Sequence, residues 1–344
     1  MVKEVLNFNY FLELKDDPIK PLKILVIRLS SMGDIIYTTP VVRCLKLQLP
    51  NAEIHFLTKP LFEYIYEGNP YLDKLLLLQE NLNDTIREIR AEKYDYLIDL
   101  HNNLRTAIIK FKTGIPASTF QKKPVLKWLY LKWRINFISK KHLVERYLET
   151  VAFLGVNNDG LPINYYLKKQ YEISDLLPLS HQNNFVAIII GATHFTKRMP
   201  NEKLARICKE MNVPVVLLGG KDVQANGDEI ASFTGENVYN SCGKITLDQS
   251  VFLLTKARKV IGFDTGLTHI AEAFDLPIAS VWGSTTPNLV GVWPYQTKYA
   301  EVIGVDLECR PCSKYGLEKC PLGHFKCMYD IPDEKLINFA NDPS

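Results

Sequence analysis

The stretch Lys23–Pro40, KILVIRLSSMGDIIYTTP, decides the fold of this chain. It begins with the short apolar run 24–27, rich in β-branched residues, which predicts a buried strand of a parallel sheet. Small and polar residues follow at 30–34, and a helical pattern of apolar residues follows over 35–45. A strand that leads through a glycine-containing loop into a helix places ligands at the carboxyl edge of an α/β sheet. Asp34 lies in that loop, where capping the helix would by itself be sufficient reason for an aspartate.

Composition excludes several classes of protein. The chain has 344 residues, which is enough for two domains, and its 47% hydrophobic and 23% charged residues are typical of soluble globular proteins. A net charge of +3 is too small to indicate nucleic-acid binding, and no apolar run reaches membrane-spanning length. The first twenty residues contain four acidic side chains and no long apolar core, unlike a secretory signal. We therefore expect a cytoplasmic protein that binds no nucleic acid.

Strands alternating with helices continue through both halves of the chain, which predicts an α/β fold with two doubly wound parallel-sheet domains. Further strands are expected at 52–58, 72–78, 94–100, 185–190, 213–218, 259–263 and 277–281, and further helices at 60–66, 83–93, from 104, 142–153, 201–211, 228–233, 247–257 and 270–274. The expected organisation is a polar N-terminal extension (1–20), a first domain (21–165), a linker (166–184), a second domain (185–330) and a C-terminal helix or tail (331–344).

The segment 110–141 interrupts this alternation. It carries many lysines and several aromatic residues, and it contains no acidic residue. Such a composition can serve nucleic acid, an anionic membrane surface or an anionic glycolipid. It can also be a solvated face whose lysine stems cover apolar surface. Because so long an unbalanced run is unusual in a nearly neutral chain, we favour a binding role.

Strands of the second half end in loops that combine glycine with threonine, serine, aspartate or lysine, at 191–200, 219–222, 264–269 and 282–287. Such loops gather at one edge of a parallel sheet. The backbone N–H groups of Gly266 and Leu267 at a helix start suit a phosphate, and Lys197 can neutralise one. Asp264 or Asp222 can accept hydrogen bonds from ribose hydroxyls. Neither a dinucleotide fingerprint nor a P-loop is present in the sequence.

Four of the seven cysteines cluster near the C-terminus, as Cys309, Cys312, Cys320 and Cys327. In a reducing compartment such thiols suggest a structural zinc site, for which His324 is an alternative ligand. The second pair is spaced more widely than in a zinc ribbon. Free thiols and a redox-active pair therefore remain the alternatives.

Four motifs in this order resemble those of glycosyltransferase family 9, which is typified by the ADP-heptose:lipopolysaccharide heptosyltransferases. They are the N-terminal signature SSMGDIIYTTP (30–40), the segment DLHNNLR (99–105), the Lys-x-x-Pro segment KRMP (197–200) and the nucleotide-sugar motif DTGLTH (264–269). The resemblance runs from about Lys23 to the cysteine cluster. It implies a GT-B fold, in which two Rossmann-like domains face each other across a cleft.

The resemblance also implies an inverting transfer. A heptose leaves ADP and is attacked by a sugar hydroxyl of a lipid A-linked core acceptor, with Asp34 as the general base. No cofactor is required for catalysis. The charge of the leaving diphosphate is then met by Lys197 and by the helix that starts at 265–267, and His269 also faces it.

The resemblance assigns residues to both substrates. Donor binding falls to Thr193, Lys197, Asp222, Asp264, Thr265, Gly266, Leu267 and His269, and acceptor binding to Ser31, Gly33, His101, Arg105, Lys122, Lys123 and Lys141. The implied partners are an ADP-sugar, an anionic glycolipid and the surface of the inner membrane, touched peripherally. Two departures concern the donor: Asp222 is the best match to the family's ribose-binding acid, and Thr286 stands where the family has an aspartate before proline. The alternatives are a GT-B enzyme that uses a UDP- or GDP-sugar, and a non-catalytic nucleotide- or glycan-binding relative.

Overall fold

The computed structural model describes residues 21–135 and 137–343, and the predicted N-terminal extension (1–20) lies outside this part. The chain packs as two compact units. Of the described residues, the first unit contains 21–30, 38–121 and 144–159. The second unit contains Ser31–Tyr37, 122–143 and 160–343. The packing therefore groups three segments of the predicted first domain, 31–37, 122–143 and 160–165, with the second unit, and it also places the predicted linker there.

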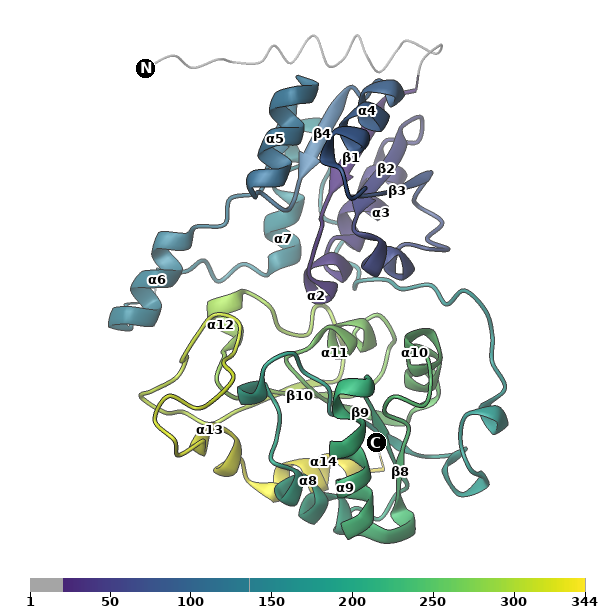
Figure 1. The fold of residues 1–344 in the computed structure, drawn as a ribbon, viewed down its shortest axis with the longest axis vertical. Coiled ribbons are helices and arrows are strands. Elements are labelled where there is room, and N and C mark those ends of the chain that lie inside the picture. The colour runs from purple at the N-terminus through teal and green to yellow at the C-terminus, as the bar shows by residue number, and fades with distance from the viewer. Residues whose placement is uncertain (1–20, 136, 344) are drawn as a thin grey trace. The chain divides into compact units, whose positions relative to one another are not determined.

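The first unit is built on a five-stranded parallel sheet in the order β3-β2-β1-β4-β5 (Figure 1). The strand of the opening stretch, β1, pairs with both β2 and β4 and is the central strand of this sheet. The strands are β1 Lys23–Ile27, β2 Glu53–Thr58, β3 Lys74–Leu77, β4 Tyr96–Asp99 and β5 Ala117–Thr119. The helices are α3 Thr39–Gln48, α4 Leu82–Glu92, α5 Leu104–Thr113 and α7 Leu143–Leu148, with 3₁₀ turns at Pro60–Ile65 and Ala152–Leu154.

The second unit is built on a six-stranded parallel sheet in the order β11-β10-β9-β6-β7-β8. Its strands are β6 Val186–Ile189, β7 Val215–Leu218, β8 Val238–Asn240, β9 Lys259–Phe263, β10 Ile278–Val281 and β11 Ala300–Ile303. Its helices are α2 Met32–Ile36, α6 Pro124–Trp133, α8 Asn201–Lys209, α9 Gln224–Thr234, α10 Leu247–Lys256, α11 Gly266–Ala271, α12 Pro287–Val290, α13 Lys326–Tyr329 and α14 Asp333–Asn341. Five short 3₁₀ turns occur at Ile173–Asp175, Leu179–His181, Phe195–Lys197, Lys221–Val223 and Gly235–Asn237.

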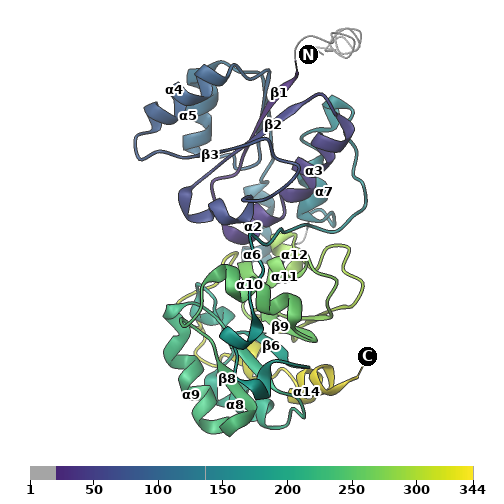
Figure 2. The ribbon, with the colours of Figure 1, turned by 90° about the vertical axis from the view of Figure 1, so that its right-hand side faces the viewer.

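Each sheet has its own apolar core. In the first unit, β1, β2 and β4 pack with α4 and α5, and Figure 2 shows these two helices on one side of the strands, with α3 and α7 on the other. In the second unit, β6, β7, β9 and β10 pack with α8, α9 and α14. The buried strands are short apolar runs, as parallel strands covered on both faces require. The predicted pair of doubly wound parallel-sheet domains is confirmed.

One predicted helix is divided. The apolar pattern over 35–45 predicted a single helix, but α2 ends at Ile36 and α3 begins at Thr39. Pro40 explains the break, because it has no N–H to donate to the carbonyl of Ile36 and its fixed φ favours a helix start. The two helices consequently belong to different units. Among the described residues, no helix is both long and apolar enough to span a membrane.

Candidate active site

Helix α2 holds Asp34 at its amino-terminal turn. Ser31 is the N-cap and Asp34 is the third helical residue, so Asp34 does not cap the helix as the sequence alone suggested. The Oδ2 atom of Asp34 accepts hydrogen bonds from the Ser31 N–H (3.3 Å) and from the Ser31 hydroxyl (3.0 Å). Ser31 and Asp34 form a capping box, and these two hydrogen bonds hold the carboxylate at the positive end of the helix. The side chain of Asp34 is half-buried, so one face of it remains accessible to a substrate.

Two glycines allow α2 to pack tightly against α11. A Cβ atom on Gly33 would lie 2.7 Å from Cδ2 of His269, closer than such contacts occur. A Cβ atom on Gly266 would collide with the side chain of Met32. Both glycines are therefore required where the loop with Asp34 meets the loop with Asp264, and both belong to the predicted motifs.

The predicted donor loops converge on Asp264, which follows β9. Its Oδ2 atom lies 2.6 Å from Nζ of Lys197 and accepts a hydrogen bond from Oγ1 of Thr285 at 2.9 Å. Its Oδ1 atom lies 3.5 Å from Nε2 of His269. Burial alone would raise the pKa of Asp264, but the hydrogen bond from His269 and the charge of Lys197 hold that pKa well below its usual range. Asp264 is therefore an anion that pairs with Lys197.

His269 is the second cation beside Asp264, after Lys197. Its Nδ1 atom lies 3.0 Å from Oε1 of Glu272 and 2.8 Å from the Tyr37 hydroxyl. Burial would lower the pKa of His269, but hydrogen bonds to Asp264 and Glu272 and the charges of these carboxylates raise it to about 9. The imidazole is therefore charged at neutral pH. His142 also lies against Tyr37, but burial lowers its pKa to about 3, so its imidazole is neutral at neutral pH.

The remaining predicted donor residues lie in loops of the second unit or at the start of α11. Thr265 is the N-cap of α11, so the N–H groups of Gly266 and Leu267 lie in the helix's first turn, where no helical carbonyl can accept them. Asp222 forms an ion pair with Arg198 at 3.0 Å. Thr193 is exposed in the same loop as Lys197. A cavity of about 250 Å³ is lined by Arg198, Val223 and Phe263, among others, where β6, β7 and β9 end.

Of the predicted acceptor residues, Ser31 and Gly33 lie on α2 beside Asp34, whereas His101 and Arg105 belong to the first unit. His101 is buried and follows β4, and Arg105 is exposed on α5, where it lines a cavity of about 390 Å³. The structure therefore distributes these residues over both units.

Part of the basic segment 110–141 has a structural role. Nζ of Lys110 lies 2.8 Å from Oδ2 of Asp99, a carboxylate with no exposed surface, and also donates to Thr119. The Oδ1 atom of Asp99 in turn accepts hydrogen bonds from the backbone N–H groups of His101 (3.0 Å) and Asn102 (2.7 Å). Lys110 thus neutralises a buried acid, so this lysine of the predicted segment has a structural role.

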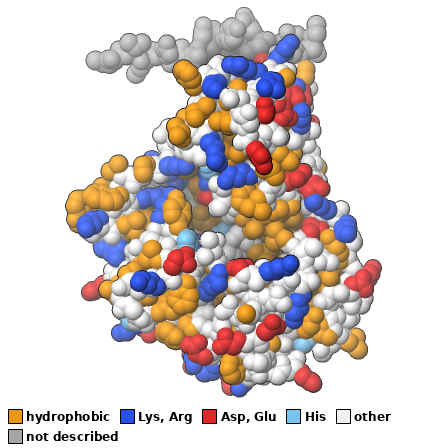
Figure 3. Space-filling view, in the orientation of Figure 1, with side chains coloured by type: hydrophobic (Ala, Val, Ile, Leu, Met, Phe, Trp, Pro, Cys, Tyr) orange, Lys and Arg blue, Asp and Glu red, His pale blue; other side chains and the backbone are white. Residues whose placement is uncertain are grey.

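Helix α6 carries the rest of that segment and contains no buried residue. Trp128 and Trp133 are 53% and 56% exposed, and their rings meet edge to face at 5.0 Å. Lys123 and Lys141 are exposed and Lys122 is half-buried. Figure 3 shows basic and hydrophobic side chains mixed over α6, at the left of the view. The helix presents aromatic and cationic groups together to solvent.

The cysteine segment supports the donor loops. Cys312 donates its N–H to the carbonyl of Ser284 (2.8 Å), and Arg310 donates to backbone carbonyls that include those of Gly283 and Thr285. Cys309, Cys312, Cys320 and Cys327 all carry free thiols, and Sγ of Cys312 lies 3.3 Å from the carbonyl oxygen of Cys309. Burial raises the pKa of Cys327 to about 12. His324, the predicted alternative ligand, has its Nε2 atom 3.9 Å from Sγ of Cys309.

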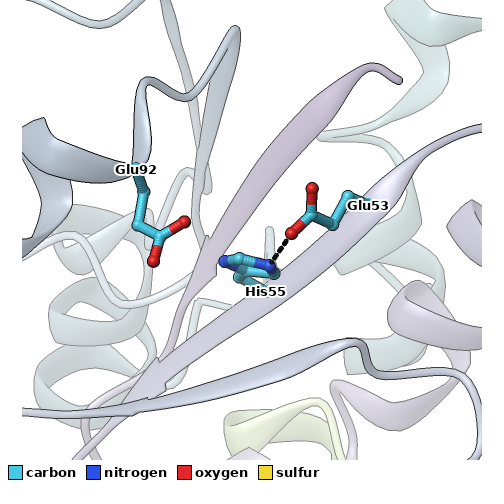
Figure 4. A group of neighbouring side chains, drawn as sticks. All are labelled: Glu53, His55 and Glu92. Atoms are coloured by element: carbon cyan, nitrogen blue, oxygen red, sulfur yellow. Dashed lines mark hydrogen bonds and ion pairs between the residues drawn. The ribbon is translucent and has the colours of Figure 1, made fainter. Parts of the chain in front are cut away.

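A different set of side chains has metal-ligand spacing. Within the described ranges, the group whose ligand atoms all lie within 4.8 Å of one another is Glu53, His55 and Glu92 in the first unit, shown in Figure 4. Glu92 is already paired with Lys23 at 2.8 Å and with Lys74 at 2.6 Å. Two lysines at these distances repel a metal ion, so this group is an ion-pair network at the amino ends of β1 and β2.

The structure adds residues to the site that the sequence did not indicate. Tyr37, Glu272 and Tyr295 lie behind His269, and Thr285 supports Asp264. Tyr37 and Glu272 are 235 residues apart, and each is a common residue type in a helical pattern. For this pair, the signal that the sequence offered was the position of Tyr37 within the first motif (30–40).

Comparisons with known proteins agree with these motifs. The family model of glycosyltransferase family 9 (heptosyltransferase) matches residues 83–322. Lipopolysaccharide heptosyltransferase 2 of Escherichia coli (strain K12) is 25% identical over 348 residues, covering 93% of this chain and 98% of that protein. A solved glycosyl transferase family 9 structure from Veillonella parvula DSM 2008 has a TM-score of 0.74 at 20% identity, covering 94% of this chain and 97% of that one. The structure of E. coli ADP-heptose lps heptosyltransferase II has a TM-score of 0.71 at 21% identity, covering 93% and 98%.

Proposed function

This chain belongs to glycosyltransferase family 9, the heptosyltransferase family, and on that premise we propose that it transfers a heptose from ADP-heptose to a lipopolysaccharide-core acceptor with inversion. The relatives it matches are named lipopolysaccharide heptosyltransferases, and one solved relative is described as an ADP-heptose enzyme. The observation that carries the proposal is the packing of Asp34's helix, α2, on α11, which begins in the nucleotide-sugar motif.

In the proposed reaction, a carboxylate oxygen of Asp34 accepts the proton of the acceptor hydroxyl. The hydroxyl oxygen forms a bond to the anomeric carbon of the heptose while the bond from that carbon to the ADP oxygen breaks. The leaving diphosphate takes the electron pair, and Lys197 and His269 stabilise its charge. Since Lys197 is paired with Asp264 at 2.6 Å, the arriving phosphate competes with that carboxylate for the lysine.

The variant Asp34→Asn tests the assignment of the base. It keeps the shape of the side chain but removes the basic oxygen, so we expect transfer to fall by about 10²- to 10⁴-fold. ADP affinity, measured by calorimetry, should remain close to that of the wild type. Transfer is measured by mass spectrometry of a core-oligosaccharide acceptor. Undiminished turnover in Asp34→Asn would exclude Asp34 as the base.

The donor nucleotide is tested separately. We expect ADP to raise the melting temperature of the protein more than UDP or GDP at equal concentration, because a ligand of the native state stabilises it. A selective response to UDP or GDP would favour the alternative of another nucleotide-sugar enzyme. Nucleotide binding without transfer to any acceptor in a panel of nucleotide sugars would favour the non-catalytic alternative.

We further propose that α6 brings the enzyme to the anionic inner-membrane surface that carries its glycolipid acceptor. Exposed tryptophans favour the bilayer interface, and lysines are attracted to anionic lipid headgroups. Trp128 and Trp133 are both exposed, and Lys123 and Lys141 flank the helix. These residues fit the predicted acceptor-side role of Lys122, Lys123 and Lys141.

Sedimentation with phosphatidylglycerol vesicles tests this contact. The double variant Trp128→Ser, Trp133→Ser should lose binding to these vesicles and keep its activity on a lipid-free acceptor. Phe111→Ser is the matched control, because Phe111 is 89% exposed on α5. Equal binding to neutral phosphatidylcholine vesicles, or unchanged binding of the tryptophan variant, would contradict the proposal.

The cysteine cluster remains a proposed structural metal site. Four thiolates suit zinc or iron in tetrahedral geometry, and the segment they would stabilise contacts the donor loops. Within the described ranges the thiols are not among the groups at metal-ligand spacing, so binding would draw them together. Elemental analysis of the purified protein for zinc and iron should find about one ion per chain. Absence of both would leave the thiols free, and Cys309→Ser should then have no effect on ADP affinity.

A further inference from the structure

Glu272 is a buried carboxylate that the proposed mechanism does not use. It is only 2% exposed, and three donors converge on it. The Tyr37 hydroxyl donates to its Oε1 atom at 2.7 Å, and Nδ1 of His269 lies 3.0 Å from the same oxygen. The backbone N–H of Tyr295 donates to Oε2 at 3.2 Å. Each oxygen of this carboxylate therefore has a partner inside the second unit.

A buried carboxylate at this position has a large desolvation cost, so the structure must compensate it. The compensating charge is His269, because Tyr37 contributes only a neutral hydroxyl whose pKa is raised well above normal by burial and by Glu272. His142, on the far side of Tyr37, is neutral. The arrangement consequently pairs one buried anion with one buried cation.

The opposite edge of the same imidazole ring, which carries Nε2, points to the donor motif. Nε2 of His269 lies 3.5 Å from Oδ1 of Asp264, and Asp264 is shared with Lys197. With Nδ1 engaged by Glu272 and Tyr37, the Nε2–H group is the one directed toward the loop that would hold the diphosphate. Glu272 thus orients the charged ring so that its Nε2–H group faces the donor loop, much as a carboxylate orients a catalytic histidine.

Tyr37 adds a second connection. It is the C-cap residue of α2, so the hydrogen bond to Glu272 ties the end of this helix to α11. Its ring also lies 5.1 Å from that of His142, which stacks on Tyr295 at 4.6 Å. Asp34 lies one turn before Tyr37 on the same helix. Any loosening of this hydrogen bond would therefore change the position of Asp34 relative to the donor motif.

We propose that Glu272 and Tyr37 are positioning residues of the transferase: Glu272 keeps His269 a cation with Nε2–H facing the donor loop, and Tyr37 fixes Asp34's helix to that cation. This inference rests on the proposed function for the identity of the donor. It adds two residues that act through His269 and Asp34 and do not themselves touch the substrate.

The first experiment measures the imidazole without any substrate. His269 is followed by NMR in protein labelled at histidine, with its signal assigned from His269→Gln. Burial opposes the charge of His269, and the carboxylates Asp264 and Glu272 favour it, so the wild-type midpoint should lie well above the ordinary value of about 6.5. Glu272→Gln should lower this midpoint clearly, and Tyr37→Phe should change it less. Glu301→Gln, an exposed glutamate on β11, is the charge-matched control and should leave it unchanged.

The second experiment follows the pH profile of kcat/KM for ADP-heptose. In the wild type the alkaline decline should follow deprotonation of His269. In Glu272→Gln this decline should move to lower pH, and Glu272→Asp should restore part of the shift. Tyr37→Phe should lower kcat with little change in the KM for the donor, because it misplaces Asp34 and leaves the charge of His269 in place.

The outcomes are separable. An unchanged His269 midpoint in Glu272→Gln overturns the inference even if the enzyme transfers heptose. A lowered midpoint in a protein that transfers nothing supports the network and counts against the proposed function instead. Thermal melts monitor folding, and if Glu272→Gln does not fold, wild-type kcat in Tyr37→Phe is enough to overturn the positioning role of this pair.

Discussion

Two histidines of this protein, one in each unit, each lie between two carboxylates, and they differ in their charge state. His55 in the first unit lies 2.8 Å from Glu53, with Glu92 beside it (Figure 4). Burial lowers the pKa of His55 more than Glu53 raises it. His269 in the second unit lies between Asp264 and Glu272, and there the carboxylates overcome burial and raise its pKa to about 9.

The difference lies in what else the carboxylates contact. Lys23 and Lys74 hold Glu92 as an ion pair and lower its pKa to about 2, so its charge is already compensated. Glu53 is 32% exposed, and water screens it. In the second unit the side chain of Asp264 is 10% exposed and pairs with Lys197. Glu272 is 2% exposed, and its partners are Tyr37, His269 and the N–H of Tyr295. The acid that distinguishes the second site is therefore Glu272, which is buried and whose charged partner is His269 itself.

The largest expected effect comes from removing the lysine of each network. Lys197→Met should lower kcat/KM by about 10³-fold, because a donor aimed at developing charge is worth that order in a buried site. Lys23→Met removes the corresponding lysine from the network around His55 and should leave kcat/KM within about twofold. Both are measured by steady-state transfer of heptose. A comparable loss in both variants would show that the two networks are equally involved in catalysis.

The second prediction compares two carboxylates that each end a central strand. Asp99 pairs with Lys110 and Asp264 pairs with Lys197. Lys110→Met leaves Asp99 buried without its cation, so it should lower the free energy of unfolding by about 3 kcal/mol in urea titrations. Lys112→Met, a more exposed lysine on the same helix, should cost less than about 0.5 kcal/mol. If Lys110→Met instead removed activity at full stability, Asp99 would belong to a binding site.

The third prediction concerns pH. The folded-state pKa of His269, about 9, exceeds its unfolded value of about 6.5, so its stabilising effect is full below about 6.5 and is lost as pH rises through about 9. The contribution is at most about 3 kcal/mol. Urea titrations between these pH values should show a decline in the wild type that is reduced in His269→Gln. A decline of the same size in both would mean that other groups titrate.

The smallest effect is expected for the histidine of the first unit. His55→Gln removes a neutral imidazole that also contacts the Tyr94 hydroxyl at 2.7 Å, so it should cost about 1 kcal/mol of stability. ADP affinity, measured by calorimetry, should not change. A loss of ADP binding in His55→Gln would show that His55, like His269, contributes to the nucleotide site.

Much of the fold follows directly from the sequence. The strands predicted at 24–27, 259–263 and 277–281 are short apolar runs. Short apolar runs that alternate with helices are typical of a parallel sheet. The proximity of Asp264 and Lys197 was also predictable, because both lie in loops that follow parallel strands.

Three features were not predictable, for physical reasons. The break between α2 and α3 depends on one missing N–H at Pro40 within a continuous apolar pattern. The role of Lys110 depends on Asp99, which lies on β4 and has a fully buried side chain. The partners of Glu272 lie on α2 and in the loop at Tyr295, and no local pattern connects them.

The grouping of Ser31–Tyr37 with the second unit matters for anyone who recombines this family. A chimera that joins two parents at a single junction near residue 160 would take these seven residues from one parent and α11 from the other. The glycine contacts at Gly33 and Gly266 would then be formed between sequences that never evolved together. A hybrid should therefore inherit Ser31–Tyr37 from the parent that supplies residues 160–343, as a short cassette inserted into the other parent's first unit.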